Sequence, residues 1–255
     1  MSAWPPRALG VLARLSLLQA GWNYRRFQNL GWAWALAPAL KALYPDKGRR
    51  LLALRRHLDL FNTHPVMASC LAGSLIKVEE DLSQGRGSEV EAIRLRDGLM
   101  APFAALGDGF FWGALRPLAG LAGAGWAWLA PAPWAPFAPA LLLLAYNPAH
   151  LGLRAWGLQR GWAKGLGVAG AVHGLGLPRL GEGLRAGAFC LAAGLALSLG
   201  RFTHPSGGQG VGLLDNFLFV GSGFLMLMLL RLRMNPLLVL GLAVAGGLMS
   251  ATTGH

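Results

Sequence analysis

The stretch PLAGLAGAGWAWLAPAPWAPFAPALLLLAYNPAHLGL, residues 117–153, decides the fold. It lies between Arg116 and Arg154 and contains no Asp, Glu, Lys or Arg. Its second part, Phe137 to Tyr146, holds an uninterrupted leucine run, Leu141–Leu144. A membrane-spanning helix needs about 20 mainly apolar residues. We therefore expect one full span here, preceded by an irregular segment that is buried within protein.

The composition of the whole chain supports a membrane environment. Soluble domains take about 25% of their residues from Asp, Glu, Lys and Arg, whereas this 255-residue chain takes 13% and is 54% hydrophobic. The mean hydropathy is +0.45. These values argue against an ordinary soluble globule and against disorder. The net charge of +12 does not require a nucleic-acid partner, because the positive-inside rule also leaves an excess of Lys and Arg on membrane proteins.

Acidic residues divide the chain at Asp108. Before this position acids and bases are mixed, and after it only Glu182 and Asp215 remain. Further apolar segments reach spanning length once their flanks are counted: Ala186–Leu199, Phe217–Leu230 and Leu237–Ala251. The sequence predicts an all-α polytopic membrane protein with about four C-terminal spans. Residues 99–255 form its membrane-embedded part, and residues 1–98 form mostly interfacial or cytoplasmic helices.

The front part has the periodicity of amphipathic helices. Apolar residues from Leu15 to Trp34 have helical spacing, and Pro38 and the Tyr44–Asp46 turn interrupt the pattern. Arg49 to Leu60 resumes it with four arginines. The apolar run from Val66 to Ile76 stops at Lys77 and Glu79; it is too short to span and suits a buried or re-entrant helix. The glycine-containing stretch from Ser83 to Ser88 is expected to be a solvent loop.

Basic residues orient the predicted spans. They gather in one expected loop from Arg154 to Arg185 and in another at Arg231 and Arg233, whereas Thr203 to Gly212 contains none. The positive-inside rule places the two basic loops in the cytoplasm. We therefore expect a cytoplasmic N-terminus and an external C-terminus.

Glycines four residues apart favour close helix packing. Such pairs let two helices approach closely in lipid, and they recur in the rear half: Gly161/Gly165, Gly170/Gly174 and Gly183/Gly187. The signal has low specificity, because 37 glycines produce such pairs by chance.

Asp108 is the most informative polar residue. Gly107 and Gly109 flank it and favour a broken helix, and its apolar surroundings imply burial. An ionisable group at membrane depth indicates a functional site with a partner, here Arg116, and transporters place discontinuous helices at their substrate sites. A structural Asp–Arg pair or a helix N-cap explains the same pattern equally well.

The segment Asn62-Thr63-His64-Pro65 is a second polar cluster. Its side chains offer hydrogen bonds to the hydroxyl groups of a ligand. Helix capping explains the same residues, with Pro65 at the first helical position. On physical grounds alone we prefer the capping interpretation.

Catalytic and metal-binding motifs are missing from the sequence. His57 and His64 lie outside a His-Glu-x-x-His frame, and no acid stands at metal-ligand spacing from either. There is neither a Gly-x-Ser-x-Gly elbow nor a Walker loop. We expect no catalytic residue, no metal and no cofactor in this chain.

Several motifs in one order carry a family resemblance. They are Gln19–Tyr24, Gln28–Gly31, Pro38–Lys41, Leu43–Lys47, Arg56–Leu58, Phe61–Pro65, Gly107–Asp108 and Phe111–Pro117. Together they resemble the IID component of the mannose/fructose/sorbose family of bacterial phosphotransferase systems. The likeness continues more weakly through Asn147-Pro148 and Met234-Asn235-Pro236, and it makes residues 1–255 one IID-type membrane domain.

The resemblance implies a permease subunit without a phosphorylated residue of its own. Such a subunit pairs with a homologous IIC chain, as part of a higher oligomer, to translocate a hexose-type sugar. Phosphorylated IIB, supplied by IIA, docks on its cytoplasmic face. The implied sugar-binding residues are Asn62, Thr63, His64, Asp108 and Arg116. The implied docking residues are Arg49, Arg50, Arg55 and Arg56.

The sequence also departs from the family pattern near the aspartate. Ala101 and Ala105 stand where the pattern has glycines, and Gly109 stands where it has a serine. A hydroxyl beside Asp108 is therefore lost. The alternative to a permease subunit is a membrane scaffold or regulatory subunit of the same family that does not transport sugar.

Overall fold

Every regular element in the described part of the chain is a helix. The computed structural model describes residues 4–200, and β pairing among them is limited to isolated bridges of Phe27 with Asn23 and with Phe61. The all-α expectation is confirmed for these residues. The chain divides into two compact units, Met1–Ala186 and Gly187–His255, and the first holds the features described below.

The N-terminal helices are shorter and more numerous than the periodicity predicts. α1 (Ala8–Leu15) and the 3₁₀ turn η1 (Leu18–Gly21) precede α2 (Asn29–Leu43). An irregular connection separates η1 from α2, and Phe27 within it has a φ of 55°. Pro38 lies inside α2, so the expectation that it interrupts the helix is wrong.

The turn after α2 starts the basic helix α3 (Lys47–Arg56). Asp46 caps this helix, because its carboxylate accepts a 2.8 Å hydrogen bond from the Arg49 backbone N–H. The predicted turn at Tyr44–Asp46 is therefore confirmed. α3 ends four residues earlier than the predicted helix, which reached Leu60.

α4 (Ala68–Ser83) is the central helix of the first unit. Its residues are almost all buried through Val78 and Glu79, and it packs most extensively on α7. The expectation of a buried helix is confirmed, and this helix continues beyond the apolar run that ends at Ile76. The loop after it is confirmed, and Gly85 and Gly87 adopt positive φ values of 77° and 81°.

A continuous helical rod follows this loop. It begins with α5 (Glu89–Gly107), which Ser88 caps through a hydrogen bond from the Glu91 N–H. It continues as the π-helical segment η2 (Asp108–Leu115) and then as α6 (Arg116–Leu129). The glycines beside Asp108 do not break the helix as expected, because the backbone widens into a π turn, a feature that is frequent at functional sites.

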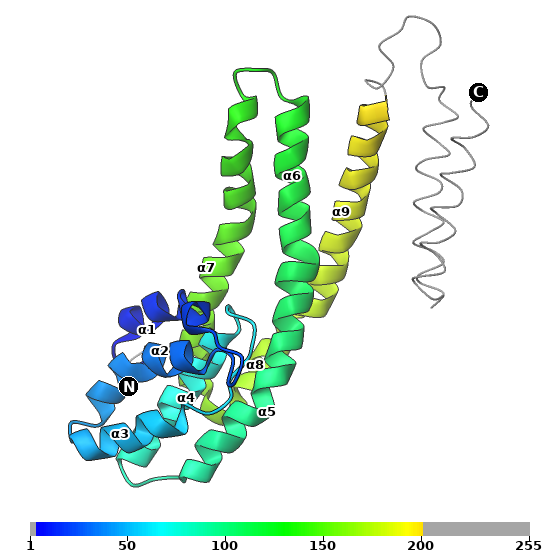
Figure 1. The fold of residues 1–255 in the computed structure, drawn as a ribbon. Helices are drawn as coiled ribbons and strands as arrows, with labels where there is room; N and C mark the ends of the chain where they lie inside the picture. Colours follow the sequence, from blue (N-terminus) through cyan, green and yellow to red (C-terminus); the bar gives the residue numbers. More distant parts are fainter. Residues whose placement is uncertain (1–3, 201–255) are drawn as a thin grey trace, which may run out of the picture. The chain divides into compact units, whose positions relative to one another are not determined.

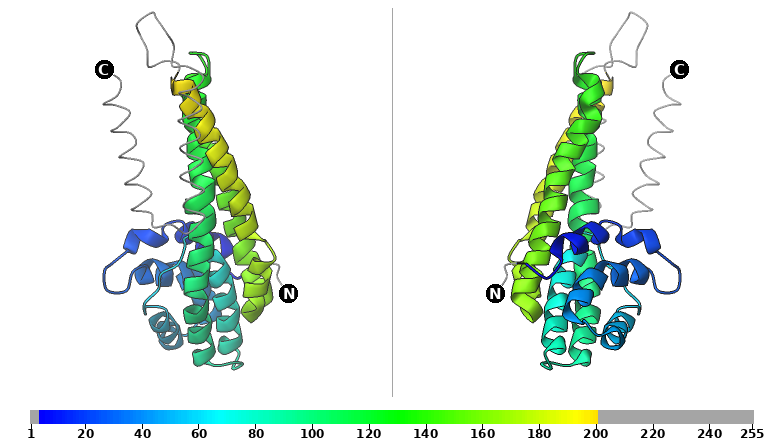
Figure 2. Two further views of the ribbon diagram at one scale, coloured as in Figure 1. Left: turned by 90° about the vertical axis from the view of Figure 1, so that its right-hand side faces the viewer. Right: turned by 90° about the vertical axis from the view of Figure 1, so that its left-hand side faces the viewer.

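α6 and α7 form a long helical hairpin. The chain turns after α6 through the 3₁₀ turn η3 (Ala135–Phe137) and returns as α7 (Ala138–Lys164). Figures 1 and 2 show α6 and α7 side by side, extending away from α1–α4. The chain then passes through η4 (Gly165–Gly167), α8 (Val168–His173) and α9 (Leu177–Gly200).

Within residues 4–200, no helix combines the length and apolar composition that are needed to cross a bilayer. The span expected within residues 117–153 and the one expected at Ala186–Leu199 are therefore not found. Residues 117–153 form most of the α6–α7 hairpin, and α7 also carries Arg154, Arg160 and Lys164, so these three residues belong to a helix and not to the expected loop. The spans expected at Phe217–Leu230 and Leu237–Ala251 lie outside the described residues.

Glycines bring α4 and α7 into close contact. A Cβ atom at Gly161 would meet the Cys70 carbonyl oxygen and would lie 2.8 Å from the Ser74 nitrogen. Gly157 faces Ser69 and Cys70 in the same way, and Gly73 of α4 faces the α7 backbone. The expected role of Gly161 is confirmed, but its partner along the helix is Gly157. Cβ atoms at Gly170 and Gly183 would meet nothing within 4 Å.

Candidate functional site

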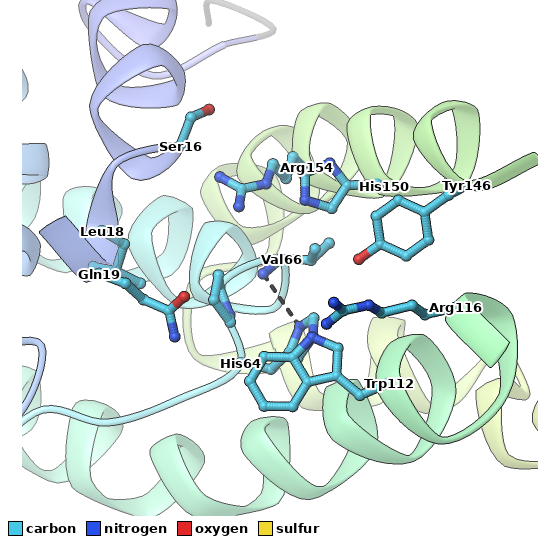
Figure 3. Close-up of a pocket in the computed structure, with 11 residues that line it drawn as sticks. Ser16, Leu18, Gln19, His64, Val66, Trp112, Arg116, Tyr146, His150 and Arg154 are labelled. Atoms are coloured by element: carbon cyan, nitrogen blue, oxygen red, sulfur yellow. Dashed lines mark hydrogen bonds between the residues drawn. The ribbon is translucent and has the colours of Figure 1, made fainter. Parts of the chain in front are cut away.

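A polar cavity of about 320 Å³ lies between α7, the start of α6 and the loop before α4. Figure 3 shows side chains from these elements converging on it. The lining residues are Ser16, Leu18, Gln19, His64, Pro65, Val66, Trp112, Arg116, Tyr146, His150 and Arg154. Its volume is at the lower end of the roughly 300–1,000 Å³ range of small-molecule sites.

Helical spacing explains how the side chains reach the cavity. Tyr146, His150 and Arg154 follow one another at four-residue intervals on α7, so they share one face of that helix. Trp112 and Arg116 have the same spacing across the end of the π segment and the start of α6. Two helix faces and one loop therefore supply most of the lining.

His64 is fixed by aromatic contacts on two sides. Its ring stacks on Phe111, with centroids 5.0 Å apart and an interplanar angle of 9°, and it meets the edge of Trp112 at 5.0 Å. Burial, with the nearby charges of Arg154 and His150, lowers the pKa of His64 to about 4. The ring is therefore neutral at physiological pH.

The tautomer of His64 follows from its backbone contact. Nδ1 accepts a 3.2 Å hydrogen bond from the Val66 N–H, so the proton of the neutral ring is on Nε2. Nε2 has no hydrogen-bond partner, and the residue is 2% exposed. His64 therefore presents an unused N–H donor at the cavity.

Arg154 is a buried cation without a hydrogen-bond partner at two of its nitrogens. The residue is 5% exposed, and its Nε and Nη1 atoms are buried and unbonded. The adjacent His150 stacks on Tyr146, with centroids 5.3 Å apart, and its Nδ1 is also buried and unbonded. No carboxylate of the described residues lines the cavity, so its positive charge is uncompensated within this part of the chain.

The structure places the predicted sugar-binding residues along one loop and the helical rod that supports it. The Thr63 hydroxyl donates to the Met100 carbonyl at 2.9 Å, and a Cβ atom at Gly107 would collide with the His64 ring. His64 and Arg116 line the cavity, whereas Asn62, Thr63 and Asp108 do not. Thr63 is buried, and its backbone is bonded at both ends to the Gln28 side chain.

Asp108 differs from its predicted setting. The expectation that it is buried is wrong, because it stands on a face of the rod that no other element of the described chain covers. No ion pair with Arg116 forms between the two described side chains. It is the first residue of the π segment, and Asn62 is likewise exposed.

The four arginines predicted to dock IIB divide into two groups. Arg49 and Arg55 are exposed. Arg50, which is half-buried, donates to the Tyr44 and Pro45 carbonyls at 3.3 Å. The side chain of Arg56 is only 9% exposed and pairs with Glu79 at 3.2 Å and with Glu89 at 2.7 Å. Arg56 is therefore not available as a surface contact.

Glu79 is the centre of a buried polar cluster that sequence reasoning missed. Its carboxylate accepts a 2.8 Å hydrogen bond from the Tyr44 hydroxyl and lies 2.9 Å from His57 Nε2. Burial alone would raise the pKa of Glu79, but the hydrogen bond and charge of His57, with Arg56 and Tyr44, outweigh burial and lower it. The cluster ties α2, α3 and α4 together.

His150 and Arg154 are the cavity residues that sequence reasoning missed. Arg154 was counted as a loop residue, which hid its four-residue spacing from His150 and Tyr146. That spacing on one helix face is the signal that would have identified them. Among the described residues, no three His, Cys, Asp or Glu side chains cluster closely enough to hold a metal ion.

Comparisons with known proteins agree on the class and the family. The fold matches a chain of the mannose transporter ManYZ in complex with microcin E492, with a TM-score of 0.58, 29% identity and coverage of 96% of this chain and 95% of that one. The architecture is therefore that of a transporter subunit.

Sequence relatives define the family. The mannose-specific EIID component of Escherichia coli K12 is 32% identical over 93% of this chain and 89% of its own length. The fructose permease IID component of Bacillus subtilis is 30% identical over 92% and 91%. Residues 8–199 match the PTS mannose/fructose/sorbose family IID component. The chain belongs to this family of membrane components of sugar permeases.

Proposed function

We propose that this chain completes a sugar translocation pathway with a IIC subunit, while phosphorylated IIB, recharged by IIA, docks on its cytoplasmic face. The observation that carries the proposal is the cavity, which combines hydrogen-bonding side chains with the aromatic rings of Trp112 and Tyr146. Coverage of nearly the full length of a mannose transporter chain supports it. No observation favours a scaffold that does not transport sugar.

The proposed sugar-binding residues fall on two surfaces. His64 and Arg116 line the cavity, whereas Asn62 and Asp108 are exposed. Thr63 positions this loop, because its hydroxyl is bonded to Met100. We place the exposed pair on the surface that IIC covers, so that sugar passes between the two subunits.

Substitution of the exposed pair tests this assignment. Asp108→Asn and Asn62→Ala each keep side-chain size similar or smaller, so assembly with IIC should be unchanged. We expect phosphoenolpyruvate-dependent sugar uptake to fall about tenfold or more for Asp108→Asn, because a hydrogen bond to a charged group is worth about 1.5–3 kcal/mol. For Asn62→Ala we expect a fall of about two- to tenfold, because a neutral hydrogen bond is worth about 0.5–1.5 kcal/mol. Glu182→Gln, an exposed acid on α9, is the matched control. Unchanged uptake in both variants would remove these residues from the mechanism.

The basic helix α3 is the proposed docking surface for IIB. It carries five basic residues and no acid, and Arg49, Arg50 and Arg55 reach the surface or its edge. The mostly buried side chain of Arg56 anchors α3 through its ion pair with Glu79. We expect Arg55→Glu to weaken co-precipitation of phosphorylated IIB at low salt, and Arg179→Glu, a matched exposed site, to leave it unchanged. Equal binding by both variants would exclude α3.

The proposed location is the bacterial cytoplasmic membrane, with several passes, the N-terminus inside and the C-terminus outside, in a higher oligomer of IIC–IID pairs. A labelling experiment on whole cells tests the orientation. With Cys190 replaced by serine, a cysteine in place of Ser206 should react with an impermeant reagent, and one in place of Lys164 should not. Ser206 lies outside the described residues. The reverse pattern would contradict the orientation.

A further inference from the structure

The cavity wall carries positive charge, as a site that binds an anion does. Arg116 and Arg154 bring two positive charges to its wall, and none of the carboxylates in the described chain lies there. Arg154 is the stronger indication, because it is almost fully buried and its Nε and Nη1 have no hydrogen-bond partner. A buried charge without a counter-charge is strongly unfavourable. Its presence therefore indicates an anion that binds from outside this chain.

The hydrogen-bonding groups agree with the charge. His64 lines the cavity and has an unused Nε2–H, because its Nδ1 accepts the hydrogen bond from the Val66 N–H. Arg154 adds unused N–H donors, and a guanidinium group can only donate. A wall that is rich in unused donors selects a ligand that is rich in acceptors. Guanidinium groups match phosphate and carboxylate oxygens, often in pairs.

The remaining lining favours a phosphate that is attached to a sugar. In Figure 3 Trp112 and Tyr146 lie on either side of Arg116, and both line the cavity. The negative π faces of aromatic rings attract the C–H bonds of a sugar ring, whereas these faces do not attract a free phosphate ion. The volume of about 320 Å³ also exceeds what a single phosphate group needs.

We propose that this cavity binds a phosphorylated sugar, with Arg154, Arg116 and His64 on the phosphate and Trp112 and Tyr146 on the ring. The anion site follows from the described side chains alone, and the sugar part rests on the proposed function. The cavity thus favours the phosphorylated product over the free sugar. It gives the permease a place where product binds before release.

Binding to the purified IIC–IID complex tests the proposal. Isothermal titration with mannose 6-phosphate, mannose and inorganic phosphate should give at least tenfold tighter binding for mannose 6-phosphate than for either other probe. Arg154→Met should weaken binding of mannose 6-phosphate at least tenfold and leave mannose binding unchanged. Arg160→Met, at an exposed position on the same helix, should bind all three probes as the parent complex does.

The melting temperature of the ligand-free complex distinguishes the ligand from a protein counter-ion. Removing an unpaired buried charge often stabilises a protein, so Arg154→Met should melt at the same or a higher temperature. A lower melting temperature with loss of IIC, and unchanged mannose 6-phosphate affinity, would show that a IIC carboxylate pairs with Arg154 and would overturn the proposal. Equal affinity for mannose 6-phosphate and inorganic phosphate would overturn the sugar assignment. These measurements do not depend on uptake, so failure of transport would not be mistaken for failure of the site.

Discussion

Two buried charged residues, Glu79 and Arg154, differ in their hydrogen-bond and ion-pair partners. Glu79 has close partners in Tyr44, His57 and Arg56, whereas Nε and Nη1 of Arg154 have none. A satisfied buried carboxylate acts as a structural anchor, and an unsatisfied buried cation is the mark of a binding site. Glu79 and Arg154 both follow mainly apolar segments, so the sequence does not show which of the two has partners in the folded protein.

Loss of the Glu79 carboxylate should destabilise the N-terminal helices. Glu79→Ala leaves Arg56 with Glu89 alone and removes the hydrogen-bond partner of His57, and breaking a buried ion pair costs about 3–5 kcal/mol. The melting temperature of the detergent-solubilised protein should therefore fall sharply. Glu182→Ala, at an exposed position, should change stability by no more than about 0.5 kcal/mol. Equal effects of the two substitutions would contradict the anchoring role.

The same anchor predicts a pH dependence. The pKa of Glu79 is lowered in the folded protein, so its stabilising contribution is complete above the ordinary glutamate pKa of about 4.3. The contribution is lost as the pH falls through the lowered pKa. Melting curves below about pH 4.3 should show a steeper loss of stability for the parent protein than for Glu79→Gln. Parallel curves would contradict this assignment.

At the scale of elements, helix identity was easier to predict than helix boundaries. The turn at Tyr44–Asp46 and the loop from Ser83 to Ser88 could be predicted because proline and glycine interrupt the helical pattern there, whereas the caps by Asp46 and Ser88 were found only in the structure. The sequence did not predict that α2 continues through Pro38, nor did it predict the π segment at Asp108. We attribute both features to packing of the surrounding helices, which the local sequence does not indicate.

The contact between α4 and α7 depends on the absence of a side chain at Gly161. In Gly161→Ala the new methyl group meets backbone atoms of Cys70 and Ser74, which cannot rotate away. We expect α7 to be pushed off α4, with a loss of about 1–3 kcal/mol and poor recovery of folded protein. Gly152→Ala on the same helix meets nothing within 4 Å, so it should gain up to about 1 kcal/mol from helix propensity. Size-exclusion profiles and melting temperatures compare the two. An unchanged Gly161→Ala protein would contradict the close contact.

At the scale of the whole molecule, composition and motif order predicted the class and the family, whereas the cavity could be found only in the folded structure. Its lining comes from η1, the loop at His64, the π segment with α6, and α7. These pieces span residues 16–154 of the chain, and the packing of α1, α4 and α6 on α7, together with the π turn, brings them together. The sequence identified His64 and Arg116 by their polarity, but Arg154 was missed because it was placed in a loop and not on the helix face of Tyr146 and His150.

The most direct test of the account is sugar uptake that depends on this chain. In cells that express the matching IIA, IIB and IIC but lack a IID subunit, radiolabelled mannose, fructose and sorbose are offered with and without this protein. The account predicts that at least one sugar is taken up and recovered as its phosphate ester only when the chain is present. Uptake that is the same in its presence and absence, with the chain assembled with IIC, would contradict it.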